Sequence, residues 1–119
     1  NAAMRRRMAV WINFDYTSVG EKISPSEVEM LRKRSKVNED IAYKVIQVGA
    51  ELRRQYKAGD LPYGPSLGDL INWATLVRDG NTPNVAAEET IIALTSDNAE
   101  VQADVRRVIE SIFDKPQGT

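Results

Sequence analysis

The sequence GPSLGDLINWATLVRDG occupies residues 64–80, and the interpretation of the whole chain starts from it. Ser66 is a residue type that caps helix N-termini, and Asp69 follows it at the spacing of a capping box. Gly80 stands where a left-handed helix end is expected. Apolar residues recur between them at the spacing of one helical face: Leu67, Leu70, Ile71, Ala74 and Val77. The wide apolar arc predicts a central helix with other helices packed around it.

The amino-acid composition excludes some classes of function. A chain of 119 residues is expected to hold one domain. Its 16 basic and 17 acidic side chains give a net charge of -1, and hence no global attraction to nucleic acid or an anionic membrane. Without cysteine or histidine, we expect no metal site and no self-contained hydrolytic centre. No apolar run approaches the ~20 residues of a membrane span, so a cytoplasmic location is expected.

The N-terminal part of the chain predicts a β-strand arm. Asn1-Ala2 looks like a scar of tag cleavage, and the abrupt start that follows reads like a piece cut from a longer protein. Residues 8–16, MAVWINFDY, alternate in β-favouring types. A lone strand cannot satisfy its backbone groups, so its sheet would lie in a preceding part of the protein or in another chain. The alternative is an extended arm packed on helices.

The remaining sequence predicts helices from their start signals. These are Ser24-Pro25 with Glu27, Asn38, Ser66 with Asp69, Thr82-Pro83, and Asp97 with Glu100. Gly49 interrupts the apolar face of the second helix and indicates close approach of another helix. The predicted fold class is therefore mainly α, with an N-terminal strand arm followed by a compact bundle of about five helices. Residues 1–22 form the arm and connection, 23–114 the helical domain, and 115–119 a frayed tail.

Some aromatic, acidic and basic side chains are of types found in binding or catalytic sites, but we interpret them as structural. Trp11, Trp73, Tyr43, Tyr56 and Tyr63 are read as core or interface residues rather than a stacking platform for bases. The carboxylate pairs Glu27 with Glu29 and Glu88 with Glu89 are read as surface groups. The basic cluster Arg32, Lys33, Arg34 and Lys36 is read as a solvated helix end favoured by the helix dipole.

Several short motifs, taken in their order along the chain, resemble one family. AMRRRM (residues 3–8) and FDY (14–16) resemble the end of the ATPase core in AAA+ proteins of the MoxR type. In that family an arginine-containing segment leads into the last core strand, which closes on an Asp-Tyr pair. GPSLG (64–68), with LI, WA and RDG within residues 70–80, resembles the lid helix of the CbbQ and gas-vesicle GvpN branch. ALTSD (93–97) is similar to that branch's C-terminal end.

The resemblance implies that this chain is the helical lid of a larger, ring-forming ATPase, preceded by the last strand of its core. In the full-length protein ATP and Mg²⁺ would be bound by a phosphate-binding loop and an Asp-Glu pair upstream. No G-x-x-x-x-G-K-[ST] motif occurs in this chain, so the fragment itself is expected to be non-catalytic. The implied parent is a hexamer that uses ATP hydrolysis to remodel a client protein.

The same resemblance assigns the candidate site residues. Arg7 falls at the position of the family's arginine finger, which acts in trans on the γ-phosphate held by the neighbouring subunit; Arg6 is the alternative if the register is off by one. A guanidinium suits this role because its planar fork bonds two phosphate oxygens and keeps its charge. Gly68 occupies the position where close relatives carry a lid arginine. It could bring backbone amides near a phosphate, but tight packing is the favoured reading.

Two other classes of function remain open. A free-standing helical interaction module would dock partner helices through exposed apolar faces, and its natural gene would begin near Ala3. A helical DNA-binding domain would use the basic residues 32–36 and bind duplex in a salt-dependent manner.

Overall fold

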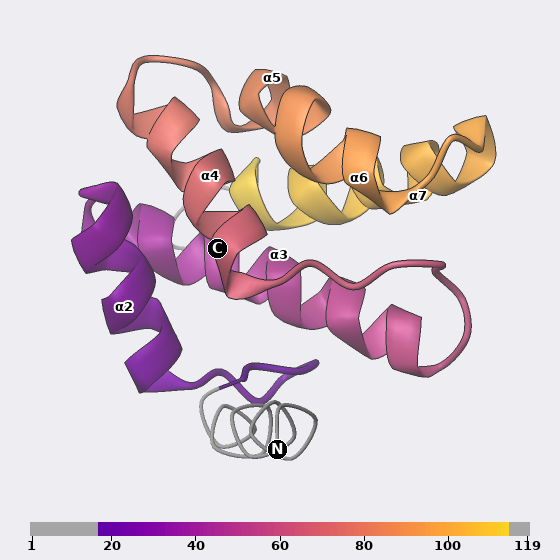
Figure 1. Cartoon of the computed structure of the whole chain (residues 1–119), viewed down its shortest axis with the longest axis horizontal. Helices are drawn as coiled ribbons and strands as arrows, with labels where there is room; N and C mark the ends of the chain where they lie inside the picture. Colours follow the sequence, from indigo (N-terminus) through magenta and orange to yellow (C-terminus); the bar gives the residue numbers. More distant parts are fainter. Residues whose placement is uncertain (1–16, 115–119) are drawn as a thin grey trace, which may run out of the picture.

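The computed structural model describes residues 17–114, and within this range the protein is built from helices joined by short connections (Figure 1). In chain order these are α2 (Pro25–Ser35), α3 (Glu39–Lys57), α4 (Leu67–Arg78), α5 (Pro83–Ala87), the π-helical segment η1 (Glu88–Ile92), α6 (Ala93–Thr95) and α7 (Ala99–Phe113). Because α5, η1 and α6 follow one another without a break, they together form the fourth of the predicted helices. The prediction of a helical bundle of about five helices is confirmed.

The predicted strand arm receives no support from the structure. Residues 8–16, on which that prediction falls, lie outside the described residues, as do Trp11 and the tail at 115–119. Residues 17–114 contain no strand; they contain one isolated antiparallel bridge, between Val19 and Lys22, which closes a tight turn. What the structure describes of the chain is therefore helical.

Side-chain caps determine where the first three helices begin. The side chains of Ser24, Asn38 and Ser66 each accept a hydrogen bond from the backbone N–H three residues later. At α4 the capping box is complete, because the Asp69 carboxylate also accepts from the backbone N–H of Ser66 at 3.0 Å. These caps lie at the positions that the sequence predicted.

The prediction that Asp97 caps the last helix is wrong. Asn98 is the N-cap of α7, and its side-chain oxygen accepts from the N–H groups of Glu100 and Val101. An amide oxygen caps a helix as well as a carboxylate does. Two adjacent residues were therefore equally good candidates, and the helix begins one residue later than predicted.

Gly49 allows α3 and α4 to cross closely, as predicted. A Cβ atom at Gly49 would lie 2.4 Å from Cδ1 of Leu70, whose side chain is fully buried. After α4, Gly80 takes a φ of 116°, and the N–H groups of Gly80 and Asn81 donate to the carbonyls of Val77 and Leu76. This pair of bonds ends α4 in a Schellman motif.

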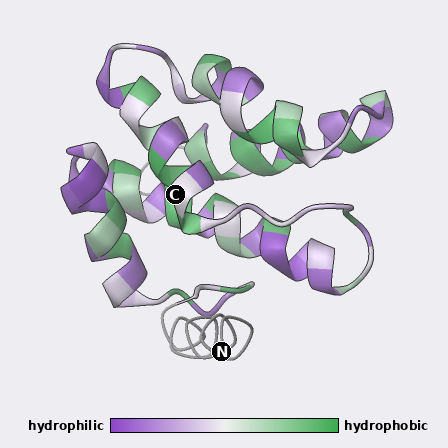
Figure 2. Ribbon diagram, in the orientation of Figure 1, coloured by the Kyte–Doolittle hydropathy of each residue, from purple (hydrophilic) through white to green (hydrophobic). Residues whose placement is uncertain are grey.

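The helix α4 is the centre of the bundle. It packs against α2, α3, α5 and η1. Trp73 of α4 is fully buried, its indole N–H donates to the Pro83 carbonyl at 2.9 Å, and its ring meets that of Phe113 edge-on with centroids 5.6 Å apart. Figure 2 shows hydrophobic and hydrophilic residues alternating along α3, as expected for a helix with one buried face. The prediction of a central helix is confirmed.

Only one of the described aromatic residues considered above belongs to the core. Trp73 is buried, whereas Tyr43, Tyr56 and Tyr63 are 44%, 50% and 36% exposed. Of the two alternatives for the tyrosines, core or interface, the core is therefore wrong, and an interface role stays a prediction. Partial exposure suits tyrosine, because its side chain combines an apolar ring with a polar hydroxyl.

The Gly49 crossing leads to a prediction about stability. Gly49→Val should lower the free energy of unfolding by about 1–3 kcal/mol, because the added methyl groups overpack the contact with Leu70. Gly68→Val is the matched control, since a Cβ there would meet only the Ser66 hydroxyl, at 3.7 Å. It should change stability by no more than about 0.5 kcal/mol. Urea unfolding measures both, and equal effects would contradict the proposed crossing.

Candidate functional site

A buried ion pair joins α2 to α3. The Glu27 and Arg53 residues are 3% and 7% exposed, and their side chains meet in a two-pronged contact. Arg53 Nη2 donates to Glu27 Oε2 at 2.8 Å, and Nη1 donates to Oε1 at 2.9 Å. The reading of Glu27 as a surface carboxylate is therefore wrong, whereas its neighbour Glu29 is half-exposed. Full burial of both charges makes this pair unlike the protein's surface ion pairs.

The same guanidinium also holds two backbone carbonyls. Arg53 Nη1 donates to the carbonyl of Ser18 at 3.0 Å, and Nε donates to the carbonyl of Pro65 at 2.9 Å. Ser18 belongs to the connection before α2, and Pro65 to the loop before α4. One side chain therefore fixes four parts of the chain relative to one another: α2, α3, the connection and the loop.

The connection that precedes α2 is held along its length. The Ser18 N–H donates to Glu27 Oε1 at 2.8 Å, and the Ser18 hydroxyl accepts from the Ser24 N–H at 2.8 Å. Gly20 has a φ of 62° and donates its N–H to the Ala50 carbonyl of α3 at 2.8 Å. Residues 17–24 thus lie against the helices as an ordered segment, which we call the connector.

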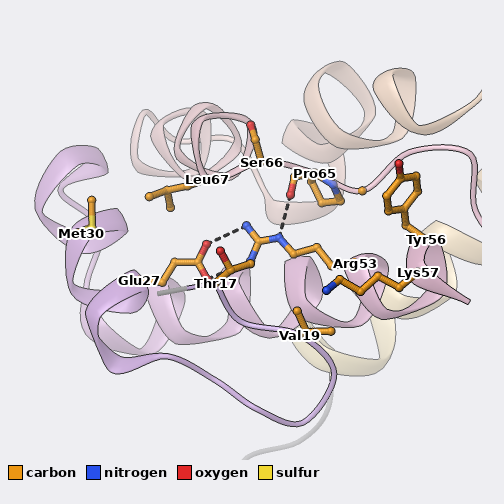
Figure 3. Close-up of a pocket in the computed structure, with 11 residues that line it drawn as sticks. Thr17, Val19, Glu27, Met30, Arg53, Tyr56, Lys57, Pro65, Ser66 and Leu67 are labelled. Carbon is orange, nitrogen blue, oxygen red and sulfur yellow. Dashed lines mark hydrogen bonds and ion pairs between the residues drawn. The ribbon is translucent and has the colours of Figure 1, made fainter. Parts of the chain in front are cut away.

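A cleft of about 550 Å³ lies between the connector and the start of α4. Figure 3 shows Glu27 and Arg53 facing each other within it, with Met30 toward one end and Tyr56 toward the other. Its volume is that of a typical small-molecule site. The lining residues are Thr17, Val19, Glu27, Met30, Arg53, Tyr56, Lys57, Gly64, Pro65, Ser66 and Leu67.

A second set of polar contacts, after the Glu27–Arg53 pair, lies at the start of α4 and joins Tyr63, Ser66 and Asp69. The Tyr63 hydroxyl donates to Asp69 Oδ2, the oxygen that also accepts from the Ser66 N–H. Burial acts to raise the pKa of Asp69, but the hydrogen bonds from Tyr63 and Ser66 hold that pKa below its ordinary value. The same contact raises the pKa of the Tyr63 hydroxyl. Asp69 is therefore a carboxylate that the fold keeps ionised.

Gly68 lies in the first turn of α4, next to Leu67 of the cleft wall. It is exposed, and a Cβ added there would approach nothing closer than the Ser66 hydroxyl, at 3.7 Å. The favoured reading, in which this glycine permits tight packing, is therefore wrong. A Cβ atom could be added at this position without a clash.

The other candidates are not brought to the cleft by the described structure. Arg6 and Arg7 lie outside the described residues. The basic cluster occupies the end of α2, where Arg32 pairs with Glu29, and Glu88 of η1 pairs with Arg106 of α7 on the exposed surface. Within residues 17–114 no group of three acidic side chains is placed to hold a metal ion, and no helix there is long and apolar enough to cross a membrane.

Reasoning from the sequence missed Arg53. The signal was its position on α3, four residues after Gly49 and seven after Ile46, both of which are buried. A charged residue on a buried stripe needs a partner of opposite charge. That partner lies 26 residues earlier in the chain, so local spacing could not identify it.

Removing one charge of the buried pair should be strongly destabilising. Glu27→Gln is expected to lower the free energy of unfolding by about 3 kcal/mol or more, because it leaves the Arg53 charge buried without a counter-charge. Glu29→Gln, which changes the exposed pair with Arg32, should leave stability nearly unchanged. Denaturant unfolding of both variants measures the difference. Similar stability of the two would show that the buried pair matters no more than a surface contact.

The lowered pKa of Asp69 predicts a pH dependence of stability. Its pKa is lower in the folded than in the unfolded state, so its contribution is complete above about pH 4 and is lost as the pH falls further. The difference in unfolding free energy between wild type and Asp69→Asn should therefore shrink between pH 6 and about pH 2–3. Asp97→Asn, at an exposed position, is the matched control. A difference that stays constant with pH would contradict the assignment.

Comparison with known protein families gives a match over most of the described helices. Residues 27–112 match the family described as CbbQ/NirQ/NorQ C-terminal. A comparison with curated protein sequences finds no match. The matched range extends from the buried Glu27 in α2 nearly to the end of α7, and this is the branch that the lid motifs indicated. The chain therefore belongs to the CbbQ/NirQ/NorQ C-terminal family, and is recognised as the C-terminal lid region of a MoxR-type AAA+ ATPase.

Proposed function

We propose that this helical domain works as the lid over the nucleotide site of a ring-forming AAA+ ATPase. The family match across residues 27–112 is the observation that carries the proposal. In the proposed protein the domain closes on ATP that is bound mainly by an upstream core. Rigid-body movement of the lid then couples hydrolysis to motion between subunits.

The cleft beside α4 supports this role because its lining suits one side of a nucleotide. Val19, Met30 and Leu67 offer apolar surface against which a flat base can lie. The N-terminus of the 12-residue helix α4 carries the positive end of a helix dipole, which favours a phosphate, while the ionised Asp69 in its first turn opposes one. Lys57 adds a cationic side chain to the same lining.

The described residues do not fit the metal part of such a site. Residues 17–114 offer no cluster of acidic side chains for Mg²⁺, and the sequence holds no phosphate-binding loop. In the proposed protein Mg²⁺ and the phosphate-binding loop belong to the core. The domain described here supplies the cover of the site, and the 119-residue chain alone is expected not to hydrolyse ATP.

Two positions of this chain are proposed to act on phosphate. Arg7 is proposed as the arginine finger that reaches the γ-phosphate bound by a neighbouring subunit, with Arg6 as the alternative in a shifted register. Gly68 is proposed to leave room for a phosphate near the backbone amides of the first turn of α4. The open space around Gly68 is consistent with that reading.

The proposed assembly is a cytoplasmic hexamer that remodels a client protein. An arginine that acts in trans requires a neighbouring subunit, and rings place each lid beside such a neighbour. The exposed apolar side chains of Val85 and Leu94, on the side of the chain formed by α5 and α6, are available for contacts with other proteins.

The arginine finger is tested in the protein extended by the residues that precede Ala3 in its gene. Arg7→Ala should retain ATP binding and lose turnover by about 10³-fold or more, as in other phosphoryl-transfer systems. Arg5→Ala is the matched control from the same triplet and should keep its activity. Loss of turnover in Arg6→Ala alone would assign the role to Arg6. Full hydrolysis in both the Arg6 and Arg7 variants would remove the triplet from catalysis.

Two further measurements distinguish the competing functions. If the natural gene begins near Ala3 and the protein binds no ATP, the free-standing interaction module is the better description. Salt-dependent binding of duplex DNA that is lost when residues 32–36 are neutralised would favour the DNA-binding domain.

A further inference from the structure

The two walls of the cleft are tied together by one side chain. The connector forms one wall and contributes Thr17 and Val19, and the start of α4 forms the other. Arg53 stands between them and donates to a carbonyl on each side, Ser18 at 3.0 Å and Pro65 at 2.9 Å. The width of the cleft at this point is therefore set by the span of a single guanidinium.

Glu27 keeps that guanidinium in place. Both of its oxygens accept from Arg53, and Oε1 also accepts from the Ser18 N–H at 2.8 Å. The carboxylate thus binds the connector and the arginine together. Because the pair is almost fully buried, water cannot substitute for these contacts without opening the fold.

We infer that Arg53 is a positioning residue that holds the connector and the start of α4 at the separation a nucleotide needs. That the ligand is a nucleotide rests on the proposed function; that Arg53 fixes the two walls rests on its contacts alone. Four of the five N–H groups of Arg53 donate to Glu27, Ser18 and Pro65, so the contacts of this side chain are with the protein and its role is one of positioning.

The geometry requires arginine rather than a general positive charge. A guanidinium presents five N–H groups in a rigid fork and can serve Glu27, Ser18 and Pro65 at once. A lysine ammonium is a compact point charge on a flexible stem. It could keep the attraction to Glu27 but could not span both carbonyls, so Arg53→Lys separates the wall contacts from the charge.

The first experiment uses the 119-residue chain and measures native-state hydrogen exchange. In Arg53→Lys the amides of Ser18 and Gly20 should exchange about 10-fold faster or more relative to the amides of α7. Val105→Ala, a core truncation in α7, is the matched control that lowers global stability without touching the cleft. If the connector amides of Arg53→Lys keep the protection they have in the control, the positioning role is overturned. Glu27→Ala, if it folds, should release the same amides.

The second experiment measures ATP hydrolysis by the extended protein. Wider separation of the walls should raise KM for ATP about fivefold or more in Arg53→Lys while kcat stays within about twofold, since the reacting groups are untouched. Val105→Ala should leave both parameters near wild type. A fall in kcat with unchanged KM would overturn the inference. If the extended protein neither binds nor hydrolyses ATP, the proposed function fails, while the hydrogen-exchange result still decides whether Arg53 fixes the walls.

Discussion

The contact between Glu27 and Arg53 is the constraint on which the rest of this domain depends. Two charges taken out of water are costly, and their mutual attraction offsets that cost only when nearly every polar atom finds a partner. Here both carboxylate oxygens and all three guanidinium nitrogens are engaged, and no buried side-chain polar atom among residues 17–114 is left without a hydrogen bond. An arginine that reaches so many partners can exist only in a fold that brings the connector, α2, α3 and the loop before α4 to one point.

Packing of buried side chains stabilises the rest of the bundle. The Glu27–Arg53 pair instead fixes how the connector, α2, α3 and the loop before α4 are placed relative to one another. Gly49 lets α3 approach α4 until Leu70 fills the crossing, and Trp73 joins α4 to α5 and α7. The residues at the centre of these contacts, Leu70 and Trp73, are fully buried. The polar cluster around Arg53 lies instead where the chain enters the bundle.

How much the sequence could predict depended on the range of each interaction. Helix starts at Ser24, Asn38 and Ser66 were predictable because capping acts within three residues. The π-helical segment η1 was not predictable, since EETII contains no glycine or proline to mark it; in the structure it packs against α4 and α7. Arg53 was missed for the same reason: its partners lie 12, 26 and 35 residues away, and no local pattern records them. The lid motifs predicted where α4 starts. They could not predict the cleft beside it, because its lining residues come from separate parts of the chain.

The arrangement also explains how a lid can lack an arginine at Gly68 and still keep a defined cleft. In the lids that the start of α4 resembles, an arginine at this position would add a positive charge beside a bound phosphate, whereas Gly68 adds none. Arg53 acts from α3 and its contacts are with the protein, so groups of this domain alone hold the two walls of the cleft together. A preformed cleft loses less conformational entropy on binding than one that must close around its ligand. In the proposed lid, which has glycine at position 68, the contribution of this domain to binding therefore depends on the shape of the cleft, and the buried pair of Glu27 and Arg53 maintains that shape.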